Sequence, residues 1–309
     1  MIEKPLVSVV VITYNSSEYI LECLDSIYNQ TYKDIELIIS DDSSKDNTAE
    51  ICEEWLSKNG ERFVRTELIT VEKNTGTSAN CNRGIEASSS EWLKLIAGDD
   101  RLLPNCISDN VDHVDKNKEV NILFSRVTPI GNIKEGEKWP YLNPEPYFSS
   151  FTPRQFRILL CERNFLPAAS AFMRKSVWRD LGRYNEDIPL LEDWPMWMKA
   201  TQMGYELSFM NKDTAEYRFS DDSQSQANPS PIYLESNQKC WMIGQQYLRN
   251  MSIGSKFFCF TSSHAKQNIF YRLLHYFNIF NPFYFEYKNT HTLFNKIHEM
   301  LIHNASNMS

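Results

Sequence analysis

The feature that most constrains the fold of this chain is an alternation of apolar runs and helical patterns over its first hundred residues. Residues 7–12 form a continuous, mainly β-branched run, and three similar runs follow at 35–39, 67–71 and 92–96. Strands that are apolar along their whole length are typical of a parallel sheet covered on both faces. The alternation with helices therefore predicts an α/β fold with right-handed crossovers.

Ligands of such sheets bind at the carboxyl ends of the strands, so the loops after Ile12, Ile39, Val71 and Ile96 are the candidate site. The first loop lacks the GxGxxG motif, which disfavours a dinucleotide-dependent oxidoreductase, and no GxxxxGK[ST] motif of a P-loop is present. The site must therefore be read from the individual side chains of these loops.

Three of these loops carry side chains suited to a nucleotide and a cation. Tyr14 can stack on a planar ring, and Asp42 can accept an imide N–H such as that of uracil. Asp99 and Asp100 offer the oxygen ligands that Mg²⁺ or Mn²⁺ takes together with substrate phosphates. The alternatives are that Tyr14 only packs its turn and that Asp42 belongs to a helix-capping turn.

A second acidic pair, Glu192-Asp193, opens a predicted helix that runs to about Met203. Asp193 is either the N-cap of this helix or a general base at its mouth. Arg218 can neutralise a phosphate or pair with an acid.

The composition narrows the class of protein. The 309 residues include 40 acids and 32 bases, so the formal charge of −8 argues against a nucleic-acid binder. Aromatic residues make up 13% of the chain, which excludes a wholly disordered protein. No apolar run is long enough to span a bilayer, no secretory signal is evident, and the seven cysteines are scattered. We therefore expect a cytoplasmic protein with reduced cysteines.

The charge is not evenly distributed along the chain. Residues 239–309 carry seven Lys or Arg side chains against two acids, and they are rich in aromatic residues. We expect a first domain over 1–225. A helical extension over 226–309 follows a polar linker near 223–231. Its basic, aromatic surface either lies on an anionic membrane or packs on the protein.

Taken in order, the strand-end motifs resemble those of the family 2 glycosyltransferases, which have the GT-A fold. The resemblance covers roughly residues 5–220. Its segments are residues 9–15, 30–37, 41–48, 74–76, 82–85, 98–100, 175–182 and 192–194. It implies a Rossmann-like mixed sheet flanked by helices, and an inverting transfer from a nucleotide-diphospho-sugar such as a UDP-sugar. It also implies that residues 1–225 form the catalytic domain, with a nucleotide-sugar half at about 1–100 and an acceptor half at about 101–225.

The resemblance also implies roles for individual residues. It puts Tyr14 and Asp42 near the nucleobase. It puts Asp99 at the ribose and metal, and Asp100 at the metal. We also expect Glu192 and Arg218 to bind the donor. Asp193 falls where such enzymes keep the base that deprotonates the acceptor hydroxyl. The implied acceptor is a glycan or lipid-linked saccharide of bacterial surface polysaccharide synthesis, reached from the inner face of the plasma membrane, with a homo-oligomer as a further expectation.

One departure from the family pattern keeps other functions open. Many members have Asp-x-Asp-Asp at the fourth strand end, but Ala97 stands at the first acidic position here. A degenerate nucleotide-sugar-binding partner subunit is therefore one alternative. A sugar-phosphate nucleotidylyltransferase is another, although it would need a glycine-rich, basic loop where residues 13–17 stand.

Overall fold

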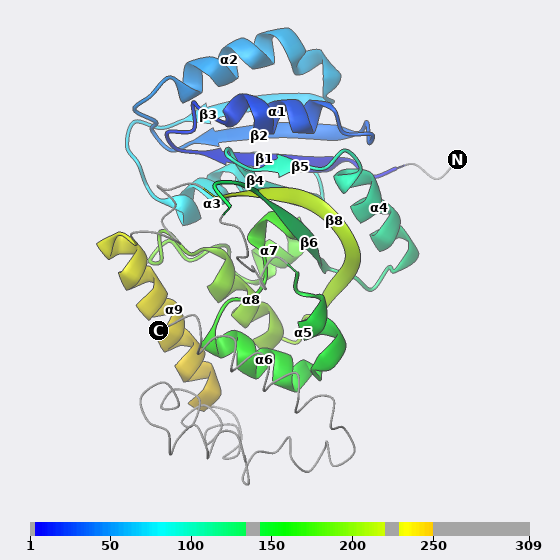
Figure 1. Cartoon of the computed structure of the whole chain (residues 1–309), viewed down its shortest axis with the longest axis vertical. Helices are drawn as coiled ribbons and strands as arrows, with labels where there is room; N and C mark the ends of the chain where they lie inside the picture. Colours follow the sequence, from blue (N-terminus) through cyan, green and yellow to red (C-terminus); the bar gives the residue numbers. More distant parts are fainter. Residues whose placement is uncertain (1–3, 134–142, 220–228, 250–309) are drawn as a thin grey trace.

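An eight-stranded mixed sheet forms the centre of the computed structural model, which describes residues 4–133, 143–219 and 229–249 (Figure 1). The strand order is β3-β2-β1-β4-β7-β6-β8-β5. The four strands at one side are mutually parallel: β1 (Val7–Thr13), β2 (Ile35–Asp41), β3 (Arg65–Thr70) and β4 (Trp92–Ala97). Each end lies within two residues of its prediction, which confirms the α/β half of the fold.

The second half of the sheet is not parallel throughout. Its strands are β5 (Arg101–Leu102), β6 (Ile122–Gly131), β7 (Phe172–Arg174) and β8 (Leu207–Phe219). Strand β7 is antiparallel to both β4 and β6, whereas β8 is parallel to β6 and antiparallel to β5. The long β8 curls across the sheet and returns to the fourth strand end (Figure 1). This is the mixed GT-A arrangement that the family resemblance implies.

Helices cover both faces of the sheet and enclose two apolar cores. The first core is covered by α1 (Ile20–Tyr28), α2 (Thr48–Asn59) and α4 (Cys106–Lys116). The second core contains residues of α3 (Thr77–Ala87), α5 (Glu145–Ser150), α6 (Pro153–Glu162), α7 (Lys175–Asp180), α8 (Asp193–Gln202) and α9 (Pro231–Arg249). Helix α3 approaches the sheet closely, because a Cβ on Gly84 would lie only 2.5 Å from Val10 Cγ1.

Helix α9 belongs to the second core. Its Cys240 and Leu248 are buried there, and a Cβ on Gly244 would lie 2.0 Å from the carbonyl oxygen of Cys161 on α6. The part of the expected extension that the structure describes therefore packs into the second core. Residues 250–309 lie outside the described residues, as does most of the expected linker, so membrane contact through the tail stays a prediction.

Two further expectations concern the described part of the chain. No helix there has the length and apolarity to cross a membrane. The six cysteines in that part, all buried, are free thiols, as expected for reduced cysteines.

Candidate active site

The carboxyl ends of β1, β2 and β4 meet at one edge of the sheet. The backbone N–H of Asp42 donates to Thr13 O at 3.0 Å, and that of Gly98 donates to Ile12 O at 2.9 Å. The loops that carry Tyr14, Asp42 and the Asp99-Asp100 pair therefore start side by side. The side chain of Tyr14 is 47% exposed, which leaves its ring accessible for stacking.

The carboxylate of Asp42 is buried and accepts four hydrogen bonds. Its Oδ2 accepts from the backbone N–H groups of Thr75 at 2.9 Å and Gly76 at 2.8 Å. Its Oδ1 accepts from Thr75 Oγ1 at 2.7 Å and Arg83 Nη2 at 2.8 Å. A carboxylate has about four acceptor positions. An imide N–H would therefore have to displace one of these protein donors.

The loop that Asp42 holds also contacts the segment that precedes α8. Gly76 has a φ of 91°, and a Cβ at this position would lie 2.7 Å from Pro189 Cβ. Ser78 donates from its backbone N–H to Pro189 O at 3.1 Å and from its hydroxyl to Ile188 O at 2.5 Å. These contacts hold the segment that precedes Asp193. A chain of contacts therefore links the loop at Asp42 to Asp193.

The Gly98-Asp99-Asp100 turn is held by the end of β8. The backbone N–H of Arg218 donates to Asp100 Oδ1 at 2.8 Å, and Arg218 Nε donates to Asp99 O at 2.8 Å. Burial, and then the charge of Asp99, raises the pKa of Asp100 well above its usual range, and burial also raises the pKa of Asp99. Two neighbouring carboxyls that are costly to ionise without a counter-charge are suited to a cation.

The acidic turn fits a divalent cation only together with substrate. No cluster of three or more His, Cys, Asp or Glu side chains that could hold a metal occurs in the described ranges. Mg²⁺ commonly takes one or two carboxylates and completes its coordination with phosphates and water. Asp99 and Asp100 match that donor set.

The guanidinium of Arg218 is engaged within the protein. Its Nη2 donates to Glu22 Oε2 at 2.6 Å, and the group lies 4.2 Å from the centre of the Tyr19 ring. Glu22 also accepts from Arg101 Nη1 at 3.2 Å. Of the two interpretations of Arg218, pairing with an acid is therefore the one that the structure shows. Through its hydrogen bonds to Asp99 and Asp100, the residue also holds the acidic turn in place.

Asp193 is the first residue of α8 and is 7% exposed. The N-cap residue is Glu192, whose side chain makes no capping hydrogen bond, so the interpretation of Asp193 as N-cap is wrong. Its Oδ2 accepts from Asn164 Nδ2 at 2.7 Å, and its Oδ1 accepts from the backbone N–H of Trp194 at 2.7 Å. The carboxylate is thus oriented by two donors, with acceptor positions left over.

Glu192 and Asp193 form an uncompensated acidic pair. Neither forms an ion pair with a Lys, Arg or His of the described residues. Burial, with the charge of Asp193 added, raises the pKa of Glu192 to about 8, and burial raises the pKa of Asp193 as well. We expect the pair to hold one proton near neutral pH, which leaves one carboxylate as a base.

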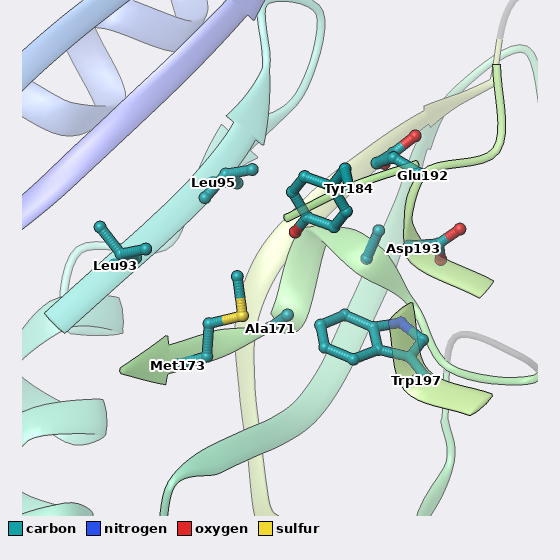
Figure 2. Close-up of a pocket in the computed structure, with 9 residues that line it drawn as sticks. Leu93, Leu95, Ala171, Met173, Tyr184, Glu192, Asp193 and Trp197 are labelled. Atoms are coloured by element: carbon teal, nitrogen blue, oxygen red, sulfur yellow. The ribbon is translucent and has the colours of Figure 1, made fainter. Parts of the chain in front are cut away.

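The acidic pair borders a pocket with largely apolar walls. Figure 2 shows Leu93 and Leu95 on one side and the two carboxyl groups on the other, with Tyr184 between them. The pocket lies between β4, β7 and α8, so residues from both expected halves of the chain line it.

Sequence reasoning missed several residues of the site. Arg83 was available as a signal, because it is the single basic residue of α3 and lies within a matched motif. Asn164 and Trp197 carry no local signal. Each is recognisable only through its spatial relation to Asp193.

Comparisons with known proteins identify the family of this chain. The model of the family "Glycosyl transferase family 2" matches residues 8–182, and the chain belongs to that family. An uncharacterised glycosyltransferase of Methanocaldococcus jannaschii is 27% identical over 83% of this chain and 86% of its own length. Chondroitin synthase of Escherichia coli is 27% identical over 65% of this chain, which corresponds to 27% of that larger protein.

Solved structures show the same fold. Staphylococcus aureus TarS 1–349 in complex with UDP-GlcNAc has a TM-score of 0.63 at 20% identity, covering 85% of this chain and 73% of that one. The mannosyltransferase PcManGT of Pyrobaculum calidifontis, in complex with GDP-Man and Mn²⁺, has a TM-score of 0.54 at 16% identity, covering 90% and 85%.

Proposed function

We propose that this protein transfers a sugar from a nucleotide-diphospho-sugar, a UDP-sugar in the first instance, to an acceptor hydroxyl with inversion at the anomeric carbon. The observation that carries the proposal is the linkage of two acidic centres. Asp99 and Asp100 lie at the strand ends, and Asp193 is tied to the same edge through Gly76 and Pro189. The bound nucleotide-sugars of TarS and PcManGT support the donor class.

In the proposed reaction, Tyr14 stacks on the nucleobase and Asp42 holds the loop that borders it. Asp99 and Asp100 would hold Mg²⁺ or Mn²⁺, which when bound neutralises charge on the departing diphosphate. Asp193 takes the proton of the acceptor hydroxyl while its oxygen attacks the anomeric carbon. The bond from that carbon to the diphosphate breaks on the opposite face, so one carboxylate base suffices for inversion.

The acceptor we propose is a saccharide or lipid-linked saccharide of a surface polysaccharide. The relatives named as chondroitin and hyaluronan synthases support a polysaccharide product. The chain spans only 27% and 19% of these two relatives, so their acceptors are a guide to the class alone.

The test is Asp193→Asn, which keeps the size of the side chain and removes the base. We expect transfer to fall by roughly 10³-fold, the middle of the range for a general base, while the donor binds as in the wild type. Transfer is measured with labelled UDP-, GDP- and dTDP-sugars, and binding by calorimetry with Mn²⁺. Near-normal turnover of the variant would overturn the assignment. Donor binding without transfer by the wild type, across the acceptors offered, would favour the degenerate partner subunit.

A further inference from the structure

A small cavity lies between β4, β7 and α8, with Glu192 and Asp193 on its wall (Figure 2). Its volume of about 20 Å³ gives room for one water molecule. Apart from the two carboxyl groups, the polar side-chain groups of its wall come from Tyr184 and Trp197. The remaining lining residues are Leu93, Leu95, Ala168, Ala171 and Met173.

Trp197 brings an unused hydrogen-bond donor to this cavity. The residue is 1% exposed, and within the described part of the chain its Nε1–H has no hydrogen-bond acceptor. Other tryptophans of the same core satisfy this group, since Trp194 Nε1 donates to Leu160 O at 2.6 Å and Trp178 Nε1 donates to Asn82 Oδ1 at 3.2 Å. A buried donor without an acceptor is costly, so its position on this wall requires an explanation.

The indole lies one helical turn from the proposed base. Residues four apart on a helix are neighbours on one face, as Asp193 and Trp197 are on α8. The ring is held edge-on against Phe124, with centroids 5.0 Å apart and an interplanar angle of 84°. This contact restricts the orientation of the ring and therefore the direction of its N–H.

The carboxylate of Asp193 has acceptor positions to spare. Two of about four are taken by Asn164 and by the backbone of Trp194. A third would suit the indole donor, and the fourth remains for an acceptor hydroxyl.

We infer that Trp197 is a positioning residue for Asp193, toward whose carboxylate its indole N–H is directed (Figure 2). This inference rests on the proposed role of Asp193 as base. The additional donor stabilises the ionised carboxylate and fixes the oxygen that faces the acceptor. Burial raises the pKa of Asp193, and its donors, Asn164 first and Trp197 last among them, oppose that rise.

The surroundings of Asp193 make one neutral donor effective. The titratable groups that face it are Glu192 on the same turn, Cys81 of α3, Tyr184 before α8, and Tyr233 and Cys240 of α9. None of them is a cation. Hydrogen-bond donors are therefore the means by which the described surroundings stabilise the charge of Asp193.

The experiment is Trp197→Phe, which keeps an aromatic ring and removes the N–H. The pKa of Asp193 should rise, so the acid limb of the kcat profile should move up by about one pH unit, with about tenfold lower kcat below neutral pH. Donor affinity, measured by calorimetry, should stay within twofold. An acid limb at the wild-type position would overturn the inference.

Trp178→Phe is the matched control. It makes the same ring change in the same core, but the N–H group that it removes donates to Asn82 Oδ1. We expect it to lower thermal stability and to leave the pH profile in place. If both variants moved the acid limb equally, the effect would be one of general packing, and the inference would fail.

Site-specific incorporation of benzothienylalanine at position 197 covers the case in which Trp197→Phe does not fold. Sulfur replaces the N–H in a side chain of almost the same shape, and the same shift of the acid limb is expected. The outcome is separable from the proposed function: if Asp193→Asn abolishes transfer while both changes at 197 leave the profile unmoved, only the role of Trp197 is wrong.

Discussion

Two acidic regions satisfy their side chains in opposite ways. One is the edge at the ends of β1, β2 and β4, called the donor edge after its proposed role, and the other is the pocket beside Glu192 and Asp193, called the acidic pocket. At the donor edge, Asp42 accepts four hydrogen bonds, one of them from Arg83, and Arg218 is paired with Glu22. In the acidic pocket, Glu192 and Asp193 lie together, and no Lys, Arg or His of the described residues forms an ion pair with either.

Under the proposed function, this difference separates the place of donor binding from the place of chemistry. A network of satisfied polar groups fixes loops in the geometry that a ligand needs, and thereby lowers the ordering cost of binding. A buried acidic pair with raised pKa values is instead poised to exchange a proton near neutral pH. The acidic turn at Asp99 and Asp100 is intermediate. It accepts hydrogen bonds from Arg218, yet the pKa values of both carboxyl groups are raised, and a bound cation can supply further counter-charge.

Asp100→Asn should produce the largest change on the donor side. The amide oxygen can still accept the N–H of Arg218, but the charge that attracts a cation is lost. We expect Mn²⁺-dependent donor affinity to fall by roughly 10²-fold or more. Calorimetry with and without Mn²⁺ measures this directly. A donor affinity that keeps its Mn²⁺ dependence would remove Asp100 from the metal site.

Asp42→Asn tests whether the donor edge is a structural network. The amide offers one acceptor oxygen for four donors and removes the carboxylate that pairs with Arg83. We expect a loss of about 2–4 kcal/mol of unfolding free energy, together with weaker donor binding. Urea denaturation gives the first quantity. Weaker binding at unchanged stability would instead indicate direct contact of Asp42 with the nucleobase.

Glu192→Gln tests the cost of holding two acids together in the acidic pocket, through the pH dependence of the free energy of unfolding. In the folded protein the pKa of Glu192 is about 8, against an ordinary value of 4.5. As the pH rises, this carboxyl group therefore ionises first in the unfolded state. Wild-type stability should fall as the pH rises from about 4.5 to about 8. The variant should lose less stability over the same window. Urea unfolding at about pH 5, 7 and 9 measures it, with exposed Glu206→Gln as control, and parallel curves for variant and wild type would contradict the account.

Glu22→Gln should have the smallest effect. It weakens the hold of Arg218 on the acidic turn by removing an exposed charge that serves Arg218 and Arg101. Exposed ion pairs contribute little, so we expect donor affinity to fall by about two- to fivefold, with kcat unchanged. Glu54→Gln, which removes an exposed pair with Lys58 on α2, is the matched control. Equal effects of the two variants would show that Glu22 does not act on the turn.

The parallel half of the fold was predictable because each strand carries its own signal. The run ending at Ile12 is apolar on both faces, and its neighbours in the sheet come from the same alternating unit. The other half depends on pairings between distant segments. Lys94 pairs with Phe172, and Arg101 pairs with Glu216, and no local pattern specifies such partners.

The candidate site divides in the same way. Tyr14, Asp42, Asp99, Asp100 and Asp193 follow strands or open a helix, so their chemistry was visible in the sequence. Their hydrogen-bond partners were not, because Asn164 reaches Asp193 only when α6 and α8 pack together. The docking of α9 was hidden for a similar reason, since Gly244 matters only against the backbone of Cys161.

The most direct test of the central claim is a crystal structure with an unreactive UDP-sugar and Mn²⁺. We expect the nucleobase against Tyr14, the diphosphate and cation at Asp99 and Asp100, and the anomeric carbon open to the carboxylate of Asp193. A nucleotide bound away from the strand ends, or an anomeric carbon that faces away from Asp193, would contradict it.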